Sequence, residues 1–246
     1  MSAPRFYCPP PLPRGNHFEL PREAAHHAHR VLRLRENDAV QVFDGEGGAF
    51  DARIAEIGGR RVVLHELQSC MEETESPLRI TLAQAMCGSE KMDWVMQKAT
   101  ELGAAEIVPV QTQRSVAKLT ADRAVKRTAH WRSVAIAACE QCGRNVLPLI
   151  HPPQDFAFWL ANLRAQTDGA RFILQPEGAT ALHKQSPPQG SVILLIGPEG
   201  GFSEDEMKMA HLADFIPVRL GKRVMRTETA AMAGIVALQT LWGDFS

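Results

Sequence analysis

The sequence predicts an α/β protein with a small strand-rich unit at its N-terminus and a larger layered domain after it. In the N-terminal part, short apolar segments follow one another at the spacing of β-hairpins. From Leu78 onward, apolar strands alternate with amphipathic helices, which is typical of a layered sheet covered by helices. The 246 residues are 45% hydrophobic and 22% charged, so the chain is expected to be a soluble globular protein with a sizeable core.

The N-terminal unit is expected to hold one helix and three strands. Pro21 stands at the first turn of a helix over 21–34, where apolar residues recur at helical spacing. Strands are expected over 39–44, 50–57 and 60–68, separated by glycine turns. These strands form a small antiparallel sheet or barrel. The acidic segment 70–77 lacks apolar periodicity and is the expected linker, so we place the domain boundary between residues 72 and 73.

The C-terminal domain, 73–246, shows a regular alternation of elements. Gly103 is the expected C-cap of one helix, and Ser203 with Glu206 forms the capping box of another. The segments 171–175 and 191–197 have wholly apolar centres, as buried parallel strands do. The expected strands are 78–86, 105–110, 171–175, 191–197 and 215–220, and the expected helices are 89–103, 120–143, 155–166, 203–213 and 227–242.

Charge is unevenly distributed along the chain. The total is close to balanced, with 27 basic against 28 acidic residues, but Thr112–Arg144 holds seven basic residues against only Asp122 and Glu140. A second basic group lies in RLGKRVMR, over 219–226. Such clusters fit a phosphate-binding face, although a solvated helix surface would have the same composition.

Two glycine loops lie between an expected strand and an expected helix. IGPEGGF, over 196–202, lets the backbone approach a ligand closely, and it matches neither a dinucleotide fingerprint nor a Walker A loop. In LGKRVMRTETA, over 220–230, Arg226 and Glu228 stand between apolar flanks, and Thr227 or Thr229 is the expected cap of the helix that follows. Each loop could also be a purely structural turn.

The remaining candidate sites are expected to have structural roles. Cys139 and Cys142 form a CxxC at the end of a helix, without two further ligands at zinc spacing, so we expect two small packed residues and no metal site. His26, His27 and His29 are expected on a solvated or RNA-facing surface. Five scattered cysteines, no signal peptide and no long apolar run lead us to expect a cytoplasmic protein that does not enter a membrane.

Four ordered motifs carry a family resemblance. KMDWVMQKATELGAAEIVPVQTQRS, EQCGRN, LLIGPEGGFSEDE and LGKRVMRTETA closely resemble the bacterial 16S ribosomal RNA (uracil-N3)-methyltransferases of the SPOUT superfamily. Cys142 departs from the pattern, in which serine is expected. Residues 1–72 are similar to the PUA-like RNA-binding domain of this family, a small β-barrel, so the resemblance covers nearly the whole chain.

The resemblance implies a deep trefoil knot in the C-terminal domain, a homodimer to which the final helix contributes, and S-adenosyl-L-methionine as cofactor. Three loops, over 174–177, 196–201 and 220–230, would hold the cofactor. The residues expected to bind it are Leu174, Glu177, Ile196, Gly197, Glu199, Gly200, Gly201, Leu220, Gly221, Met225, Arg226, Thr229 and Ala230.

The expected substrate is a uridine of 16S rRNA, within the assembled small ribosomal subunit. Methylation at N3 removes a weakly acidic proton, so we expect Arg226 to face the uracil anion and Glu199 or Glu228 to orient or deprotonate the base. The residues expected to dock RNA are Arg114, Lys118, Arg132, Arg144, Lys222 and Arg223. Two alternatives stay open: methylation of another position such as a ribose 2′-hydroxyl, and a non-catalytic RNA-binding or ribosome-assembly factor.

Overall fold

The structure, a computed structural model, describes residues 3–12, 17–58, 61–70, 73–115, 121–163, 169–176 and 180–245. The chain forms two compact units. Unit 1 comprises Met1–Glu75 together with Ile136–Leu147, and unit 2 comprises Ser76–Ala135 together with Pro148–Ser246. Among the described residues, no helix has both the length and the apolar character needed to cross a bilayer.

Unit 1 is built on a five-stranded sheet in its described part, with strand order β1-β3-β4-β5-β2. The three expected hairpin strands are confirmed, whereas β1 and β2 were not anticipated. Strand β1 pairs parallel to β3, and the other pairs are antiparallel. The expected helix is shorter than predicted and ends as a π-helical turn, η1. The elements are β1 Arg5–Tyr7, β2 His17–Glu19, α1 Arg22–His26, η1 His27–Val31, β3 Ala39–Phe43, β4 Ala49–Gly58 and β5 Arg61–Cys70.

The segment Ile136–Leu147 packs with unit 1, although the sequence places it in the C-terminal domain. Cys139 is buried in a small apolar cluster that includes Phe43. The carboxylate of Glu140 accepts a hydrogen bond from the backbone N–H of Tyr7 at 3.0 Å. These contacts join parts of the sequence that are far apart, and no local sequence pattern indicates them.

Unit 2 contains a parallel sheet, which is eight-stranded over the described residues, with order β11-β13-β10-β12-β6-β7-β8 and β9 beside β7. The five expected strands are confirmed, and the two-residue strands β8, β9 and β11 are additional. The strands are β6 Arg79–Ala85, β7 Ala104–Gln111, β8 Leu149–Ile150, β9 Gln154–Asp155, β10 Ala170–Leu174, β11 Thr180–Ala181, β12 Ser191–Ile196 and β13 Ile216–Arg219.

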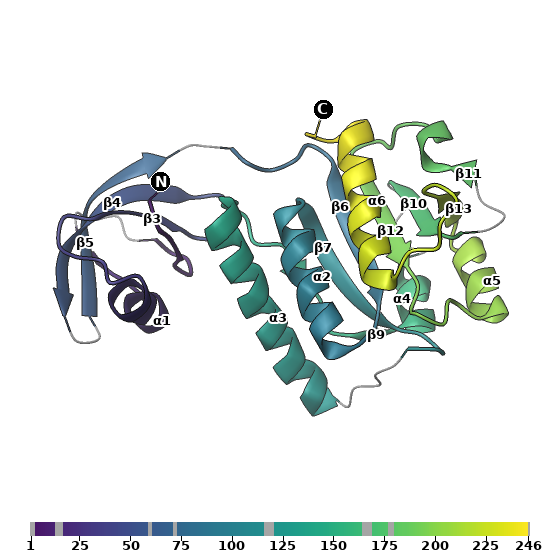
Figure 1. The fold of residues 1–246 in the computed structure, drawn as a ribbon, viewed down its shortest axis with the longest axis horizontal. Helices are drawn as coiled ribbons and strands as arrows, with labels where there is room; N and C mark the ends of the chain where they lie inside the picture. Colours follow the sequence, from purple (N-terminus) through teal and green to yellow (C-terminus); the bar gives the residue numbers. More distant parts are fainter. Residues whose placement is uncertain are drawn as a thin grey trace. The chain divides into compact units, whose positions relative to one another are not determined.

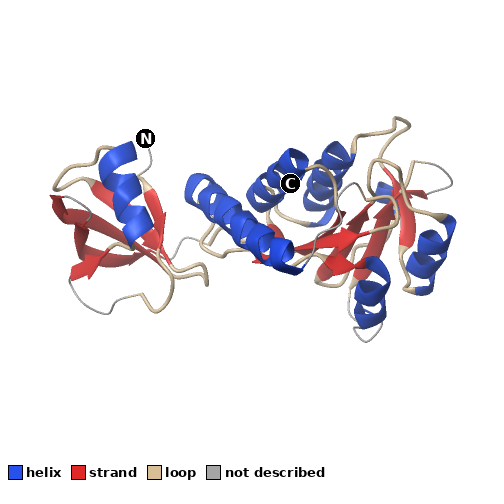
Figure 2. Ribbon diagram, turned by 90° about the horizontal axis from the view of Figure 1, so that it is seen from below, coloured by secondary structure: helices blue, strands red, loops and turns tan. Residues whose placement is uncertain are grey.

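Helices cover both faces of this sheet (Figure 2). One core cluster packs helices α2 and α6 and the buried Trp131 against one face, and a second cluster packs α4 and α5 against the other. Figure 1 shows α6 beside α2. The helices are α2 Ser89–Glu101, α3 Ala121–Cys142, α4 Phe156–Leu163, the short 3-10 helix η2 Leu182–Lys184, α5 Glu204–Leu212 and α6 Thr227–Trp242.

The ends of two helices test the expected capping. The capping box of α5 is confirmed, because the Ser203 hydroxyl accepts from the N–H of Glu206 while the Glu206 carboxylate accepts from the N–H of Ser203. The prediction that Thr227 or Thr229 caps α6 is wrong. Arg226 occupies the N-cap position without a side-chain cap, and Thr227 bonds elsewhere. The knot stays a prediction.

Close packing brings α6 onto the centre of the sheet. Gly234 faces Leu194 of β12, and a Cβ atom at that glycine would lie 2.6 Å from a Leu194 methyl carbon. Only glycine allows this approach without displacement. The N-terminus of α6 is thereby held at the same sheet edge as the end of β12.

Candidate functional site

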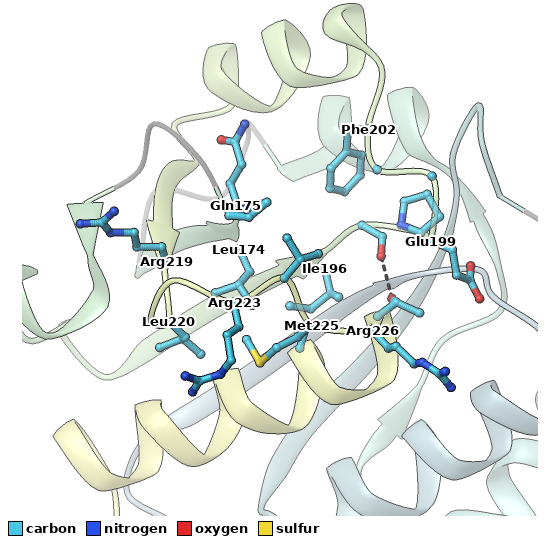
Figure 3. A pocket seen from close by; sticks show the side chains of 18 of the residues that line it. Leu174, Gln175, Ile196, Glu199, Phe202, Arg219, Leu220, Arg223, Met225 and Arg226 are labelled. Carbon is cyan, nitrogen blue, oxygen red and sulfur yellow. Dashed lines mark hydrogen bonds between the residues drawn. The ribbon is translucent and has the colours of Figure 1, made fainter.

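A cavity of about 650 Å³ lies at the carboxyl ends of three neighbouring strands, β13, β10 and β12. The loops that follow these strands form its walls (Figure 3). Parallel strands that lie side by side end at the same edge of a sheet, and such crevices are where open α/β sheets bind ligands. The two glycine loops and the end of β10 therefore meet at one site.

The structure brings together most of the residues expected to bind a cofactor. Those that line the cavity are Leu174, Ile196, Gly197, Glu199, Gly200, Gly201, Leu220, Gly221, Met225, Arg226 and Ala230. Thr229 is exposed on α6 and does not line it. Glu177 lies outside the described residues. Six further lining residues lie within the three expected loops without having been singled out as cofactor-binding: Gln175, Pro176, Pro198, Arg223, Val224 and Thr227. The lining residues outside those loops are Phe202, Met207 and Arg219.

Glycine is required at specific points of these loops. Gly201 and Gly221 have φ angles of +67° and +71°, in the left-handed region that side chains with a Cβ disfavour. Gly197 packs against the ring of Phe202, which a Cβ atom would approach to 2.9 Å. The loops are thus tightly fitted turns that also expose backbone to the cavity.

A buried hydrogen-bond chain fixes the loop after β12 to the start of α6. The hydroxyl of Thr227 donates to the carbonyl of Gly197 at 2.7 Å and accepts from the amide Nε2 of Gln84 at 2.8 Å. Gln84 is fully buried in β6. The sequence did offer a signal for Gln84, because it is a polar residue inside a buried strand, where such groups are normally bonded.

Two carboxylates converge on one ammonium group beside the cavity. Lys91 Nζ lies 2.8 Å from Glu199 Oε1 and 3.6 Å from Glu228 Oε2. Burial acts to raise the pKa of Glu199, but the hydrogen bond from Lys91 and its positive charge outweigh burial, so this pKa is lowered. The two glutamates expected to serve catalysis are therefore neighbours. Lys91 was missed, because its place in an amphipathic helix gives no signal of this contact.

Arg226 is exposed and lines the cavity from the N-terminus of α6. Glu199 and Arg226 lie at one side of the cavity and Arg219 at the other (Figure 3). The cavity thus presents the Arg226 guanidinium and the Glu199 carboxylate on the same side. Such a pair of opposite charges can stabilise an anion and accept a proton.

The basic residues expected to dock RNA lie in different environments. Arg132, Lys222 and Arg223 are exposed, and Arg223 also lines the cavity. Arg114 is exposed while donating a hydrogen bond to the carbonyl of Gly200 at 2.8 Å, so it braces the glycine loop. Lys118 lies outside the described residues.

Arg144 corrects the expectation of an exposed docking cation. It is only 4% exposed and belongs to unit 1, where its Nε donates to a Glu75 oxygen at 3.0 Å. A guanidinium group buried against a carboxylate is a structural ion pair rather than a surface for phosphate.

The cysteine pair has a structural environment. Cys139 is buried and Cys142 half-buried, and neither forms a disulfide. The hydrogen bond with Cys142, together with burial, raises the pKa of the Cys139 thiol. Within the described ranges, no group of three or more histidine, cysteine, aspartate or glutamate side chains is placed to hold a metal ion.

The fold and the cavity define an α/β enzyme of the class that binds a ligand on glycine loops at the strand ends, joined to a small strand-rich unit. A family model described as an RNA methyltransferase domain matches residues 74–239, and one described as an RNA methyltransferase PUA domain matches 20–67. The chain belongs to this RNA methyltransferase family. The N-terminal unit is accordingly PUA-like.

Known relatives cover the whole chain. The Ribosomal RNA small subunit methyltransferase E of Buchnera aphidicola is 32% identical over 244 residues, covering 99% of this chain and 96% of its own. The protein of that name from Neisseria gonorrhoeae, solved bound to S-adenosyl methionine, is 38% identical with a TM-score of 0.91 and full coverage of both chains. A protein from Legionella pneumophila, solved with bound cofactor SAM, is 35% identical with a TM-score of 0.93, again over both full chains.

Proposed function

We propose that this chain transfers a methyl group from S-adenosyl-L-methionine to N3 of a specific uridine in the 16S rRNA of the small ribosomal subunit. One observation carries the proposal. The three loops expected to hold the cofactor meet at one cavity, in a chain similar over its full length to proteins named as small-subunit rRNA methyltransferases. The cytoplasm, where ribosomes form, is the expected place of action.

The residues present fit this cofactor. When bound, it supplies a methyl group on a positively charged sulfur. Its adenine requires an apolar slot, which Leu174, Ile196, Leu220 and Met225 can form. Its polar ends require backbone donors and acceptors, which the loop over 196–201 offers. A volume of about 650 Å³ is within the usual range for sites of small ligands.

The charged residues at the cavity fit removal of the N3 proton. A uracil that loses this proton carries negative charge on its two carbonyl oxygens, and Arg226, which lines the cavity, would stabilise that charge. Glu228 or Glu199, directly or through water, would accept the proton or orient the base. Because N3 lies on the pairing edge, the target uridine must be unpaired or flipped when it reacts.

Replacement of Arg226 tests this assignment. We expect Arg226→Ala to reduce the rate of methyl transfer by about 100-fold or more, because a charge that stabilises the anion is lost. Arg219→Ala is the matched control, since Arg219 is also exposed and lines the opposite side of the same cavity. Full activity of Arg226→Ala would refute the role of Arg226.

The exposed cations of unit 2 are the proposed docking surface for RNA. Lys222 is suited to a separate test, because it is exposed and does not line the cofactor cavity. We expect Lys222→Glu and Arg132→Glu to weaken RNA binding and to reduce its dependence on salt, with cofactor affinity unchanged. An equal fall in cofactor affinity would contradict the assignment.

We also propose that the protein acts as a homodimer. Trp94 of α2 and Val236 and Leu241 of α6 are large apolar side chains that are well exposed in the single chain. Helices α2 and α6 pack against each other, so these side chains belong to one helical layer. Sedimentation equilibrium would give the mass of two chains, and a monomer at micromolar concentration would refute the proposal.

A further inference from the structure

Lys91 connects the loop after β12 to the start of α6. It lies in the first turn of α2 and does not itself line the cavity. Its ammonium group donates a hydrogen bond of 2.8 Å to Glu199 on the loop after β12. At 3.6 Å it also faces Glu228, in the first turn of α6.

The two carboxylates need this positive charge. Glu228 Oε2 is buried and has no hydrogen-bond partner among the described residues, so the nearby ammonium of Lys91 compensates it electrostatically. Two like charges that share one small site repel each other strongly when nothing neutralises them. Cys87, which precedes α2, is buried in the same region, where burial and the charge of Glu199 raise its pKa to about 12. It stays neutral and cannot replace Lys91.

We propose that Lys91 is a positioning residue for methyl transfer: its ammonium group ties Glu199 on the cofactor loop to Glu228 on α6 and balances their charge at the edge of the cofactor cavity. This inference rests on the proposed function. The two glutamates differ in their access to the cavity. Glu199 lines the cavity and accepts a direct hydrogen bond from the ammonium group. Glu228 does not line the cavity, and its Oε2 is buried 3.6 Å from Lys91 Nζ.

The charge of Lys91 and its effect on loop geometry can be told apart by comparing the affinities for two ligands that differ in charge. S-adenosylmethionine carries a positive sulfur, whereas S-adenosylhomocysteine, which lacks the methyl group, is neutral there. Removal of Lys91 leaves excess negative charge beside the cavity, which favours the cation over the neutral product. A loosened loop would instead weaken both ligands alike, because they occupy the same cavity. The ratio of the two affinities therefore reports charge and is insensitive to loop disorder.

Calorimetric titration of the full-length protein with both ligands tests this. For Lys91→Met we expect the ratio of S-adenosylmethionine to S-adenosylhomocysteine affinity to rise about three- to tenfold. Lys91→Arg should keep the wild-type ratio, and the double variant Lys91→Met/Glu199→Gln should restore it. Lys98→Met is the matched control, because Lys98 is on the same helix and pairs only with Glu101 among described ion pairs.

The pH profile of methyl transfer gives a second readout. The titratable groups that interact with Lys91 are Glu199, Glu228 and Cys87. In Lys91→Met the hydrogen bond and the positive charge that lower the pKa of Glu199 are lost, so this pKa rises and the acid limb of the rate should move up by about one pH unit.

An unchanged affinity ratio and acid limb in Lys91→Met would overturn the inference while leaving the proposed function intact. If Lys91→Met does not fold, a wild-type ratio in a folded Lys91→Gln variant would overturn it equally. Wild-type protein that binds neither ligand would overturn the proposed function and this inference with it.

Discussion

The bridge from Thr227 to Gly197 gives the sharpest test of how the cavity is held. In Thr227→Val the side chain keeps its shape but loses the bond to the Gly197 carbonyl and leaves one N–H of the buried Gln84 amide without its acceptor. A lost hydrogen bond costs about 1 kcal/mol, and a buried polar group left unpaired costs about 1–3 kcal/mol. We expect the variant to lose about 2–4 kcal/mol of stability.

Thermal unfolding and calorimetry measure the two consequences. A loss of this size lowers the unfolding midpoint of a domain of this length by roughly 5–15 °C. Because Gly197 lines the cavity, the affinity for S-adenosylmethionine should fall by about tenfold as its loop becomes less ordered.

Thr229→Val is the control, since Thr229 lies exposed on the same helix. Its effect should stay within about 0.5 kcal/mol. A wild-type midpoint in Thr227→Val, or an equal loss in Thr229→Val, would refute the reasoning.

Two further predictions concern ion pairs outside the cavity. The hydrogen bond from His151 is the main cause that lowers the pKa of Glu106 to about 2, despite partial burial. The charged Glu106 side chain therefore stabilises the folded protein fully above the unfolded pKa near 4.5, and this stabilisation is lost as the pH falls towards 2. Glu106→Gln should remove up to about 3 kcal/mol of this pH dependence, as measured by acid unfolding. Arg144→Ala should destabilise unit 1 by about 3 kcal/mol through the uncompensated Glu75, with cofactor affinity unchanged in titration. Weaker RNA binding at unchanged stability would instead restore Arg144 as a docking residue.

Local patterns predicted much of the fold. The bounds of α6 and the capping box at Ser203 follow from side-chain periodicity and from hydrogen bonds between near neighbours, so they can be read from the sequence. The strand order β13-β10-β12 brings three loops to one edge, and no local pattern specifies that order. The resemblance to a known family, rather than periodicity, indicated that these loops form one site.

The remaining features depend on contacts between distant parts of the chain. Lys91 meets Glu199 across 108 positions of sequence, and Arg144 meets Glu75 across 69. A basic residue looks the same in the sequence in a buried ion pair and on an RNA-facing surface. Thr227 looked like a helix cap, but its hydroxyl serves a tertiary bond to Gly197 instead. The burial of a side chain and the residue it pairs with decide these roles, and both are set only when the chain folds.

Methyl transfer to small ribosomal subunits purified from cells lacking this protein tests the central claim most directly. The subunits would be incubated with the protein and S-adenosylmethionine, the rRNA digested, and the methylated nucleoside identified and mapped by mass spectrometry. The account predicts 3-methyluridine at one position of 16S rRNA. Methylation of a ribose 2′-hydroxyl, or no transfer at all, would contradict it.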